Sequence, residues 1–322
     1  MTSIRNMVVG DEITEFYLLK EAEVKQTRST TPKDYFDMVL SDQSGDIPAK
    51  FWDVTPTDKE TFFPRQLVKV KGIVQSYNER LQFKVEKIRV ATEEDGVQLT
   101  DFIRAAPVPA EELIERIHEV TASIKDEDIR RVVAFCVGKS GDKLTHYPAA
   151  KSNHHAYFAG LAYHMNRMLE MGEFICGQRP YLNPDLVKAG IILHDIAKPE
   201  EMIAELGIVS DYSVSGKLLG HLALAYGWIT EAAIHLQLSL TNEKVIALQH
   251  LVLSHHNLGE WGSPVQPQLP EAVALHYIDQ LDAKLQAVED ALNTTPETEE
   301  WTKPIRVIEN KPIYRLKGLQ PS

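Results

Sequence analysis

The spacing of hydrophobic residues changes once along this chain of 322 residues, and no other sequence feature constrains the fold as strongly. Between residues 13 and 92 apolar and polar residues alternate, as in strands with one buried face, whereas from Ala110 onward the apolar residues recur at helical spacing. Residues 93–109 separate the two parts with an acidic run and two prolines. We therefore predict a multidomain protein with a β-barrel over residues 1–95, a linker over 96–109, an all-α helical bundle over 110–295 and a C-terminal arm over 296–322.

The first part has the strand pattern of a small closed barrel. Alternation predicts strands at residues 35–40, 47–52, 67–75 and 81–86, with turns at 42–46 and 77–80. Gly72, inside the third of these runs, predicts a bend. About five strands in a segment of this length are typical of an OB-fold.

An OB-fold often binds nucleic acid, because exposed aromatic side chains stack on bases and basic side chains contact the phosphates. The candidates for stacking are Tyr35, Trp52 and Tyr77, and the candidates for phosphate contacts are Lys50, Lys69, Lys71 and Lys84. The alternative is that the aromatic residues fill the barrel and the lysines only solvate its outside. Both interpretations stay open at the level of the sequence.

The second part has the pattern of several packed helices. Helical spacing predicts segments at residues 111–137, 153–177, 184–196, 215–238, 242–256 and 270–292. Asn183-Pro184 and Pro270-Glu271 are typical helix starts. Beyond residue 296 the chain is rich in proline and mixed in charge, and apolar residues such as Trp301 and Tyr314 predict that this arm packs on another part of the protein.

An imidazole and a carboxylate, His194 and Asp195, end the apolar run of residues 190–193, where core residues are expected. Burying such groups without partners costs roughly 2–7 kcal/mol each, and a bound metal ion is the simplest partner. Eleven of the twelve histidines lie between His146 and His276. The candidate ligands lie on five successive predicted helices, which can bring them to similar depth in a bundle. They are His164, His194, Asp195, His221, His255, His256 and Asp279.

Several residues near this pattern have two interpretations. Adjacent residues of a helix point about 100° apart, so either one or both of His255 and His256 can be ligands. Asp282 shares a helix face with Asp279 and is a candidate for supporting a ligand instead of binding metal. His154 and His155 either contact a substrate or cap the helix that follows.

The order His, His-Asp, His, His-His, Asp resembles the HD-domain metal-dependent phosphohydrolases, and the additional histidines resemble the dinuclear members of that superfamily. Together with the preceding barrel, six short motifs are similar to the YhaM-type 3′→5′ exoribonucleases over roughly residues 10–295. These motifs are residues 153–157, 160–164, 219–221, 253–257, 260–264 and 276–284. Residues 296–322 have no counterpart in this resemblance.

The resemblance implies a phosphodiester hydrolase that releases nucleotides from the 3′ end of single-stranded RNA, which the barrel holds. It implies two divalent cations that share Asp195 and activate a water, with His164, His194 and Asp279 on one cation and the other three histidines on the second. Lys198 matches the lysine that faces the substrate phosphate in this family, so His194, Asp195 and Lys198 are the expected catalytic residues. A nitrogen-rich ligand set suits Mn²⁺ or Fe²⁺ better than Mg²⁺, and the resemblance implies manganese.

Composition bears on partners and location. The net charge of −12 argues against a nucleic-acid partner, but residues 65–90 hold seven basic residues against two acidic ones, which leaves room for a local basic patch. No apolar run reaches the roughly 18 residues of a membrane span, and the N-terminal apolar segment is too short for a signal peptide. We therefore expect a cytoplasmic location and no membrane partner. Cys136 and Cys176 are expected to be buried thiols.

Single-stranded RNA is the expected partner. Single-stranded DNA stays open as a second substrate, because the choice depends on one or two contacts to a 2′-hydroxyl group. Self-association stays open as well.

Two other functions fit parts of the sequence. An HD domain also suits the hydrolysis of small nucleotides or cyclic dinucleotides, a reaction that would not need the barrel. A nucleic-acid-binding protein with a purely structural metal site would bind RNA without forming a product.

Overall fold

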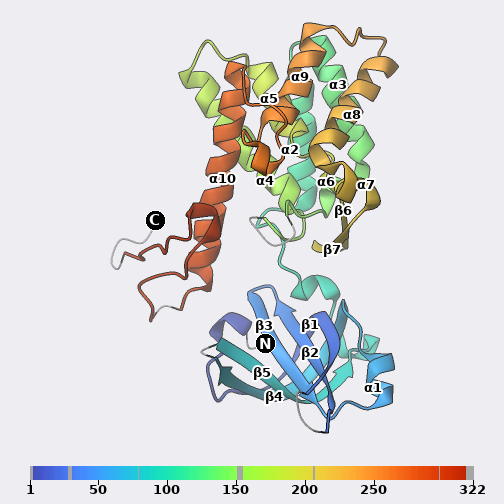
Figure 1. Ribbon diagram of the computed structural model, residues 1–322, viewed down its shortest axis with the longest axis vertical. Coiled ribbons are helices and arrows are strands. Elements are labelled where there is room, and N and C mark those ends of the chain that lie inside the picture. The colour runs from blue at the N-terminus through green and yellow to red at the C-terminus, as the bar shows by residue number, and fades with distance from the viewer. Residues whose placement is uncertain are drawn as a thin grey trace. The chain divides into compact units, whose positions relative to one another are not determined.

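The computed structural model describes residues 3–27, 31–78, 80–150, 155–205, 207–296 and 298–316. The chain divides into two compact units, Met1–Arg104 and Ala105–Ser322 (Figure 1). The first unit contains the strands of the barrel, and the second contains the histidines and carboxylates singled out above. Between the barrel and Ala105 lie two short 3₁₀ turns, Glu93–Asp95 and Leu99–Phe102.

Five strands close into a barrel in the first unit: β1 (Glu12–Gln26), β2 (Asp34–Asp42), β3 (Gly45–Trp52), β4 (Gln66–Tyr77) and β5 (Arg80–Val90). Their order is β1-β2-β3-β5-β4, and β1 closes the barrel by pairing with β4. β3 and β5 run parallel, and the other described pairs are antiparallel. The predicted OB-fold is confirmed.

The alternating pattern located β2 to β5 but not β1, the longest strand. Three consecutive residues of β1, Tyr17, Leu18 and Leu19, are buried, and the pairing with β2 shifts register between Leu19 and Glu21. A bulge of this kind interrupts the two-residue period on which the sequence prediction depends.

Gly72 lies at a second register shift, between β4 and β5. A Cβ atom at this position would lie 2.1 Å from the backbone oxygen of Lys84, so the close approach of β5 requires glycine here. Inside the barrel, side chains such as Phe36, Met38 and Phe83 form the core. A short helix, α1 (Pro56–Thr61), connects β3 to β4 and begins at a capping box between Thr55 and Asp58.

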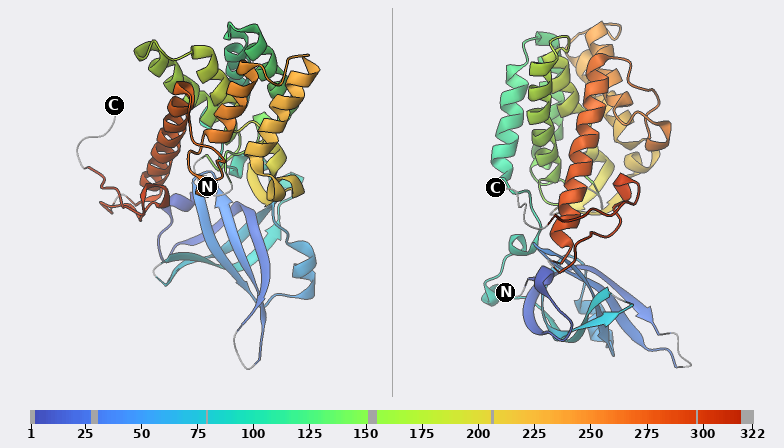
Figure 2. Two further views of the ribbon diagram at one scale, coloured as in Figure 1. Left: turned by 45° about the horizontal axis from the view of Figure 1, so that its top comes forward. Right: turned by 90° about the vertical axis from the view of Figure 1, so that its left-hand side faces the viewer.

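The second unit is a bundle of helices around α5 (Pro184–Leu193). This helix is mostly apolar and packs against α2, α3, α4, α9 and α10, which explains why every residue from Ala189 to Leu193 is buried. In the right-hand view of Figure 2, α2, α4 and α10 stand next to one another, and α4 packs against both of the others. The other helices of this unit are α2 (Ala110–Ser123), α3 (Glu127–Ser140), α4 (Gly160–Gln178), α6 (Lys198–Glu201), α7 (Val214–Leu218), α8 (Gly220–His235), α9 (Glu243–Ser254) and α10 (Pro270–Thr294).

The predicted helical segments differ from the observed helices at three breaks. The segment 111–137 is two helices, because the Asp126 carboxylate accepts hydrogen bonds from the N–H groups of Asp128 and Ile129 and so begins α3. The segment 153–177 begins as a helix only at Gly160. The segment 215–238 breaks before Gly220, whose φ of 74° lies in the left-handed region.

The second unit is not purely helical, contrary to the sequence prediction. A hairpin of β6 (Met202–Glu205) and β7 (Ile208–Tyr212) turns at Gly207, whose φ is 78°. A Cβ atom on Gly207 would lie 2.2 Å from the backbone nitrogen of Phe158. The hairpin therefore needs glycine here both for the positive φ and for the close approach of Phe158. Strands of four and five residues are too short for their alternation to stand out in a sequence.

The described part of the C-terminal arm folds back on the end of α10. The Arg315 guanidinium donates hydrogen bonds to the backbone oxygens of Leu292, Thr295 and Pro296. The rings of Trp301 and Tyr314 lie 5.0 Å apart, centroid to centroid. Arg315 therefore satisfies carbonyl groups that the end of a helix leaves without intrahelical partners.

None of the helices in the described ranges combines the length and the apolar character that a membrane crossing requires. Cys136 is a buried free thiol, and Cys176 is a half-buried one.

Candidate metal centre

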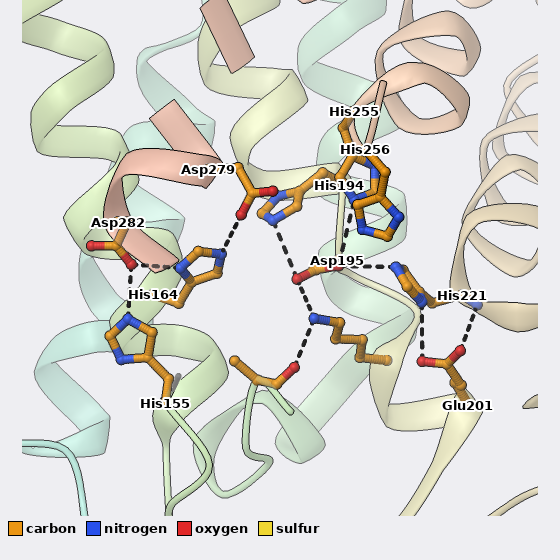
Figure 3. A network of polar contacts seen from close by, with 12 residues as sticks. His155, His164, His194, Asp195, Glu201, His221, His255, His256, Asp279 and Asp282 are labelled. Atoms are coloured by element: carbon orange, nitrogen blue, oxygen red, sulfur yellow. Dashed lines mark hydrogen bonds and ion pairs between the residues drawn. The ribbon is translucent and has the colours of Figure 1, made fainter. Parts of the chain in front are cut away.

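The helical unit brings the predicted ligands together from five places in the chain (Figure 3). His164 lies on α4 and Asp279 on α10, whereas His221 lies in the first turn of α8. His194 with Asp195 directly follows α5, and His255 with His256 directly follows α9. Helix ends and inward-facing helix positions therefore converge on one region of the bundle.

The first group of ligands, the His164 cluster, consists of His164, His194 and Asp279. One ligand atom from each of these residues lies within 4.8 Å of the others, and all three side chains are buried. Nε2 of His164 lies 3.3 Å from a carboxylate oxygen of Asp279. Two imidazoles and a carboxylate in this arrangement can hold one divalent cation.

The second group, the His221 cluster, consists of His221, His255 and His256. Their ligand atoms also lie within 4.8 Å of one another, but only His255 is fully buried. The rings of the adjacent His255 and His256 both face this group, with centroids 4.0 Å apart. Both members of the pair are therefore placed where a ligand is needed.

Asp195 lies between the two clusters (Figure 3). Its Oδ2 lies 3.3 Å from Nε2 of His194, and its Oδ1 lies 3.3 Å from Nε2 of His221 and 3.9 Å from Nε2 of His255. Each carboxylate oxygen thus faces one cluster, as in a bridging ligand. Lys198 lies beside it, with Nζ 2.6 Å from Oδ2 of Asp195 and 2.7 Å from the Ala149 backbone oxygen, to which it donates a hydrogen bond.

The second nitrogen of each candidate histidine ligand is occupied by a hydrogen bond. Nδ1 donates to a backbone oxygen in His194, His255 and His256, at 2.6–2.7 Å. Nδ1 of His164 lies 2.7 Å from a carboxylate oxygen of Asp282, and Nδ1 of His221 lies 3.0 Å from one of Glu201. When Nδ1 carries the proton of a neutral ring in such a bond, the lone pair is at Nε2, and Nε2 faces the clusters.

Four ligand atoms in the described part of the chain are buried and have no hydrogen-bond partner there: Nε2 of His194, His221 and His255, and Oδ1 of Asp195. Buried polar atoms in native proteins are almost always paired, because an unpaired one costs the full desolvation penalty. These atoms are all electron-pair donors and converge on the same space. The residues therefore fit divalent cations, which would accept those lone pairs.

The charges of the site support the same conclusion. Burial alone would raise the pKa of Asp195, but the Lys198 ammonium and the adjacent histidines outweigh it and hold that pKa well below its usual range. Burial lowers the pKa of His255 far below its usual value, and it lowers that of His256 as well. At neutral pH Asp195 is therefore anionic and His255 and His256 are neutral, which are the forms in which these groups bind metal.

His164 differs from the other histidines. Burial lowers its pKa, but hydrogen bonds to the carboxylates of Asp279 and Asp282 outweigh burial and raise the pKa to about 9. A cation that binds Nε2 of His164 must therefore displace a proton at neutral pH.

The structure contradicts the prediction that His155 contacts a substrate or caps a helix. His155 is fully buried, Nε2 lies 2.8 Å from Asp282, and Nδ1 lies 2.7 Å from the Tyr157 hydroxyl group. The N-cap of α4 is Ala159, and it has no side-chain cap. His154 lies outside the described residues.

Known proteins share both halves of this architecture. The HD domain family matches residues 161–284, and the family of OB-fold nucleic acid binding domains matches residues 21–91. The chain is 39% identical to the 3′-5′ exoribonuclease YhaM of Geobacillus sp. (strain WCH70) over 307 residues, which are 95% of this chain and 93% of the relative. It is 38% identical to that of Bacillus subtilis (strain 168), over 95% of this chain and 96% of the relative. The chain belongs to the YhaM family of 3′-5′ exoribonucleases.

Solved structures resemble this YhaM family member less closely. The second OB-fold domain of replication protein A from Methanococcus maripaludis is 15% identical and covers 28% of this chain and 92% of its own, with a TM-score of 0.23.

The barrel of this YhaM family member places four of the predicted RNA-binding residues on the outer face of β2, β3 and β5. The rings of Tyr35 and Trp52 stack 4.7 Å apart, and the Lys50 ammonium lies 5.1 Å from the Tyr35 ring. Lys50 pairs in register with Lys84 of β5, and Lys50 is also 2.5 Å from the Asp37 carboxylate. Trp52 is 40% exposed, so one ring of the stack is open to solvent.

The remaining barrel candidates lie elsewhere. Tyr77 ends β4 beside the turn to β5 and is 61% exposed. Lys69 and Lys71 are outward residues of β4, opposite Arg89 and Lys87 of β5, and the Lys69 ammonium lies 4.8 Å from the ring of Phe16. The predicted contacts thus divide into a group on β2, β3 and β5 (Tyr35, Lys50, Trp52 and Lys84) and a group on β4 (Lys69, Lys71 and Tyr77).

Sequence reasoning missed the residues that hold the ligands in place, apart from Asp282. Glu201 accepts hydrogen bonds from both the backbone nitrogen and Nδ1 of His221, and the Trp261 backbone oxygen accepts one from His256. Glu201 is twenty residues from His221 in the sequence. A backbone carbonyl group is present in every residue, so a sequence does not show which one accepts a hydrogen bond. No pattern in the sequence identifies such contacts, because they depend on where α6 and the loop after α9 lie.

Proposed function

We propose that this chain is a metal-dependent exoribonuclease that hydrolyses single-stranded RNA from its 3′ end and releases nucleotides. The full-length similarity to proteins named 3′-5′ exoribonuclease, which includes both the barrel and the helical unit, carries this proposal. The buried lone pairs of the metal centre support it, because they supply the ligand set that a metal-dependent phosphodiester hydrolase needs.

We assign two divalent cations to the centre. His164, His194 and Asp279 would hold one, His221, His255 and His256 the other, and Asp195 would bridge them. When bound, such a pair makes a water molecule acidic enough to act as a nucleophile at neutral pH. Five imidazoles with two carboxylates favour Mn²⁺, with Fe²⁺ as the alternative, over the oxygen-preferring Mg²⁺.

The protein side chains have separate parts in the reaction. Asp195, kept anionic by Lys198, keeps one oxygen directed at each cluster. The Lys198 ammonium stays charged despite its burial, because Asp195 raises its pKa, and it can offset the negative charge that develops on the phosphoryl oxygens. The backbone oxygen of Ala149 fixes the direction of this ammonium.

We further propose that the barrel holds the RNA strand. The Tyr35–Trp52 stack offers a flat, partly exposed surface for a base, and Lys50 and Lys84 lie beside it for the phosphates. Tyr77, Lys69 and Lys71 would contact other parts of the strand. The limits of 1–95 for the barrel, 96–109 for the linker, 110–295 for the catalytic domain and 296–322 for the arm are part of this proposal, as are the use of single-stranded DNA and self-association. The cytoplasmic location stays a prediction.

The test is an end-labelled digestion. Metal-stripped protein is incubated with 5′-labelled single-stranded RNA, or with DNA of the same sequence, in Mn²⁺, Mg²⁺ or no metal, and the products are resolved at single-nucleotide resolution. We expect a manganese-dependent ladder that shortens from the 3′ end. Intact RNA in every lane would overturn the proposal and leave small nucleotides and cyclic dinucleotides as the substrates to test next.

A further inference from the structure

The two clusters of the metal centre differ in what surrounds them. Behind the His164 cluster lies a continuous chain of buried hydrogen bonds, and Figure 3 shows its part from His164 through Asp282 to His155. One oxygen of Asp282 lies 2.7 Å from Nδ1 of His164 and 2.8 Å from Nε2 of His155, and Nδ1 of His155 lies 2.7 Å from the Tyr157 hydroxyl group. All four side chains are buried.

The chemistry of these groups allows one direction for the protons. A carboxylate has no proton to donate, so the Asp282 oxygen accepts hydrogen bonds from Nδ1 of His164 and from Nε2 of His155. In the neutral form of the His155 ring the single proton is therefore on Nε2, and Nδ1 has a lone pair. Nδ1 of His155 must then accept the hydrogen bond of the Tyr157 hydroxyl group. The result is a fixed orientation of His164 with Nε2 toward Asp279.

The His221 cluster has weaker support. Among the described residues, Glu201 holds Nδ1 of His221 at 3.0 Å, and both side chains are 12–13% exposed. His256 is held by the backbone oxygen of Trp261, a residue of an exposed turn. The three nitrogen ligands of this cluster share one carboxylate, Asp195, with the other cluster, whereas the His164 cluster has Asp279 in addition.

We propose that Tyr157, His155 and Asp282 are positioning residues that make the His164 cluster the tighter of the two metal sites, so that the cation of the His221 cluster exchanges first. This inference rests on the proposed two-metal centre and not on the identity of the substrate. A ligand held in its binding orientation loses little conformational entropy when it binds, and a buried site gives a chelator little access.

The experiment measures metal retention. The full-length protein is loaded with Mn²⁺ alone, equilibrated with increasing concentrations of a chelator, and separated from it, and the manganese per chain is determined by mass spectrometry. We expect loss in two steps of one ion each. His221→Ala should remove the first step and leave the second, which assigns the retained ion to the His164 cluster.

Two matched variants separate the clusters. Asp282→Asn keeps the shape of the side chain but removes the charge that holds His164, and we expect the second step to move to roughly 10- to 100-fold lower chelator concentration. Glu201→Gln makes the same change behind His221 and should move only the first step to lower chelator concentration. Tyr157→Phe removes one hydroxyl group and should shift the second step in the same direction as Asp282→Asn, by less.

The outcomes distinguish this inference from the proposed function. Loss of both ions in one step, or an unchanged second step in both Asp282→Asn and Tyr157→Phe, would overturn the inference. A wild-type protein that binds at most one ion would instead contradict the two-metal centre. If Asp282→Asn does not fold, which circular dichroism of the metal-free variant reveals, Tyr157→Phe still decides the question.

Discussion

The candidate functional residues of the barrel and of the helical unit lie in opposite parts of their folds. In the helical unit the candidate ligands His164, His194 and His255 are fully buried, whereas in the barrel Trp52 and Tyr77 are among the exposed aromatic side chains. A buried polar group is costly and needs a fixed partner, whereas an exposed ring costs little whether or not RNA covers it. Substitutions of the buried candidate ligands should therefore abolish the reaction, and substitutions of the exposed barrel residues should weaken binding in graded steps.

The largest effect is expected for Asp195→Asn. This change keeps the side chain's shape but removes the negative charge that faces both clusters, and several kcal/mol of stabilisation should be lost, which corresponds to at least about 10³-fold in kcat. Single-turnover hydrolysis of RNA in Mn²⁺ measures the loss. Binding of RNA, followed by fluorescence anisotropy, should stay within a factor of two or so of wild type, since the barrel is unchanged. A loss of RNA binding as large as the loss of kcat would contradict the separation of binding on the barrel from catalysis in the helical unit.

The next effect is a dependence on pH that only the helical unit should show. Since the carboxylates of Asp279 and Asp282 raise the pKa of His164 from 6.5 to about 9, metal must displace a proton there. The affinity for Mn²⁺ should then increase by roughly tenfold per pH unit between pH 7 and 9. Calorimetric titration in buffers of different ionisation enthalpy measures the proton released.

The raised pKa of His164 also predicts how the stability of the metal-free protein depends on pH. The folded pKa of His164 is higher than the unfolded value of 6.5, so this group stabilises the metal-free protein fully below pH 6.5 and loses that contribution as the pH rises to about 9. The melting temperature of the helical unit without metal should fall over this interval. A melting temperature that rises there would show that His164 is neutral in the metal-free protein.

A smaller effect is expected for Trp52→Ala on the barrel. Loss of one stacking platform costs about 1–3 kcal/mol, so the KM for a long RNA should rise by roughly 5- to 150-fold with little change in kcat. A dinucleotide, which offers no upstream strand for the barrel to hold, should be hydrolysed as before. Tyr181→Ala, which removes an exposed aromatic ring from the helical unit, is the control. A fall in kcat instead of a rise in KM would show that the barrel takes part in the chemistry.

A still smaller effect separates the two groups of lysines on the barrel. Each phosphate contact of a single strand adds about 0.7 to the slope of log K against log salt concentration. Replacing Lys50 and Lys84 by glutamine should lower this slope by about 1.4 if both contact phosphates. The matched pair Lys69 and Lys71 on β4 tests the other group. Unchanged slopes in both double variants would mean that the lysines only solvate the barrel.

The smallest effect concerns the C-terminal arm. Arg315→Ala leaves carbonyl groups at the end of α10 without their charged donor and should cost about 1–2 kcal/mol of stability. The melting temperature of the helical unit should fall by a few degrees, and RNA affinity should not change. Arg306→Ala, in the same arm, is the control. A loss of RNA affinity without a loss of stability would assign the arm to substrate binding.

In both units, the sequence predicted the features that burial imposes on the order of residue types. Burial leaves a pattern in the residue types of a sequence. Strands β2 to β5 could be predicted because apolar and polar residues alternate in a half-buried strand. The candidate ligands could be predicted because a histidine is unexpected at the end of an apolar helix. β1 was missed where three buried residues in a row and a bulge remove the pattern. The hairpin of β6 and β7 was missed because its strands are too short to show one.

What the sequence determined by itself is therefore the division into a strand-built and a helix-built part, the OB-fold, and which histidines and carboxylates are candidates for the metal centre. Only the tertiary structure decided how they are grouped, that each oxygen of Asp195 faces one cluster, and that His155 supports His164 through Asp282 instead of meeting a substrate. Burial depends on the residue's own chemistry and its neighbours along the chain, so it leaves a pattern that can be read. Hydrogen-bond partners that are twenty to more than a hundred residues apart depend on how the helices pack, and no local pattern records that.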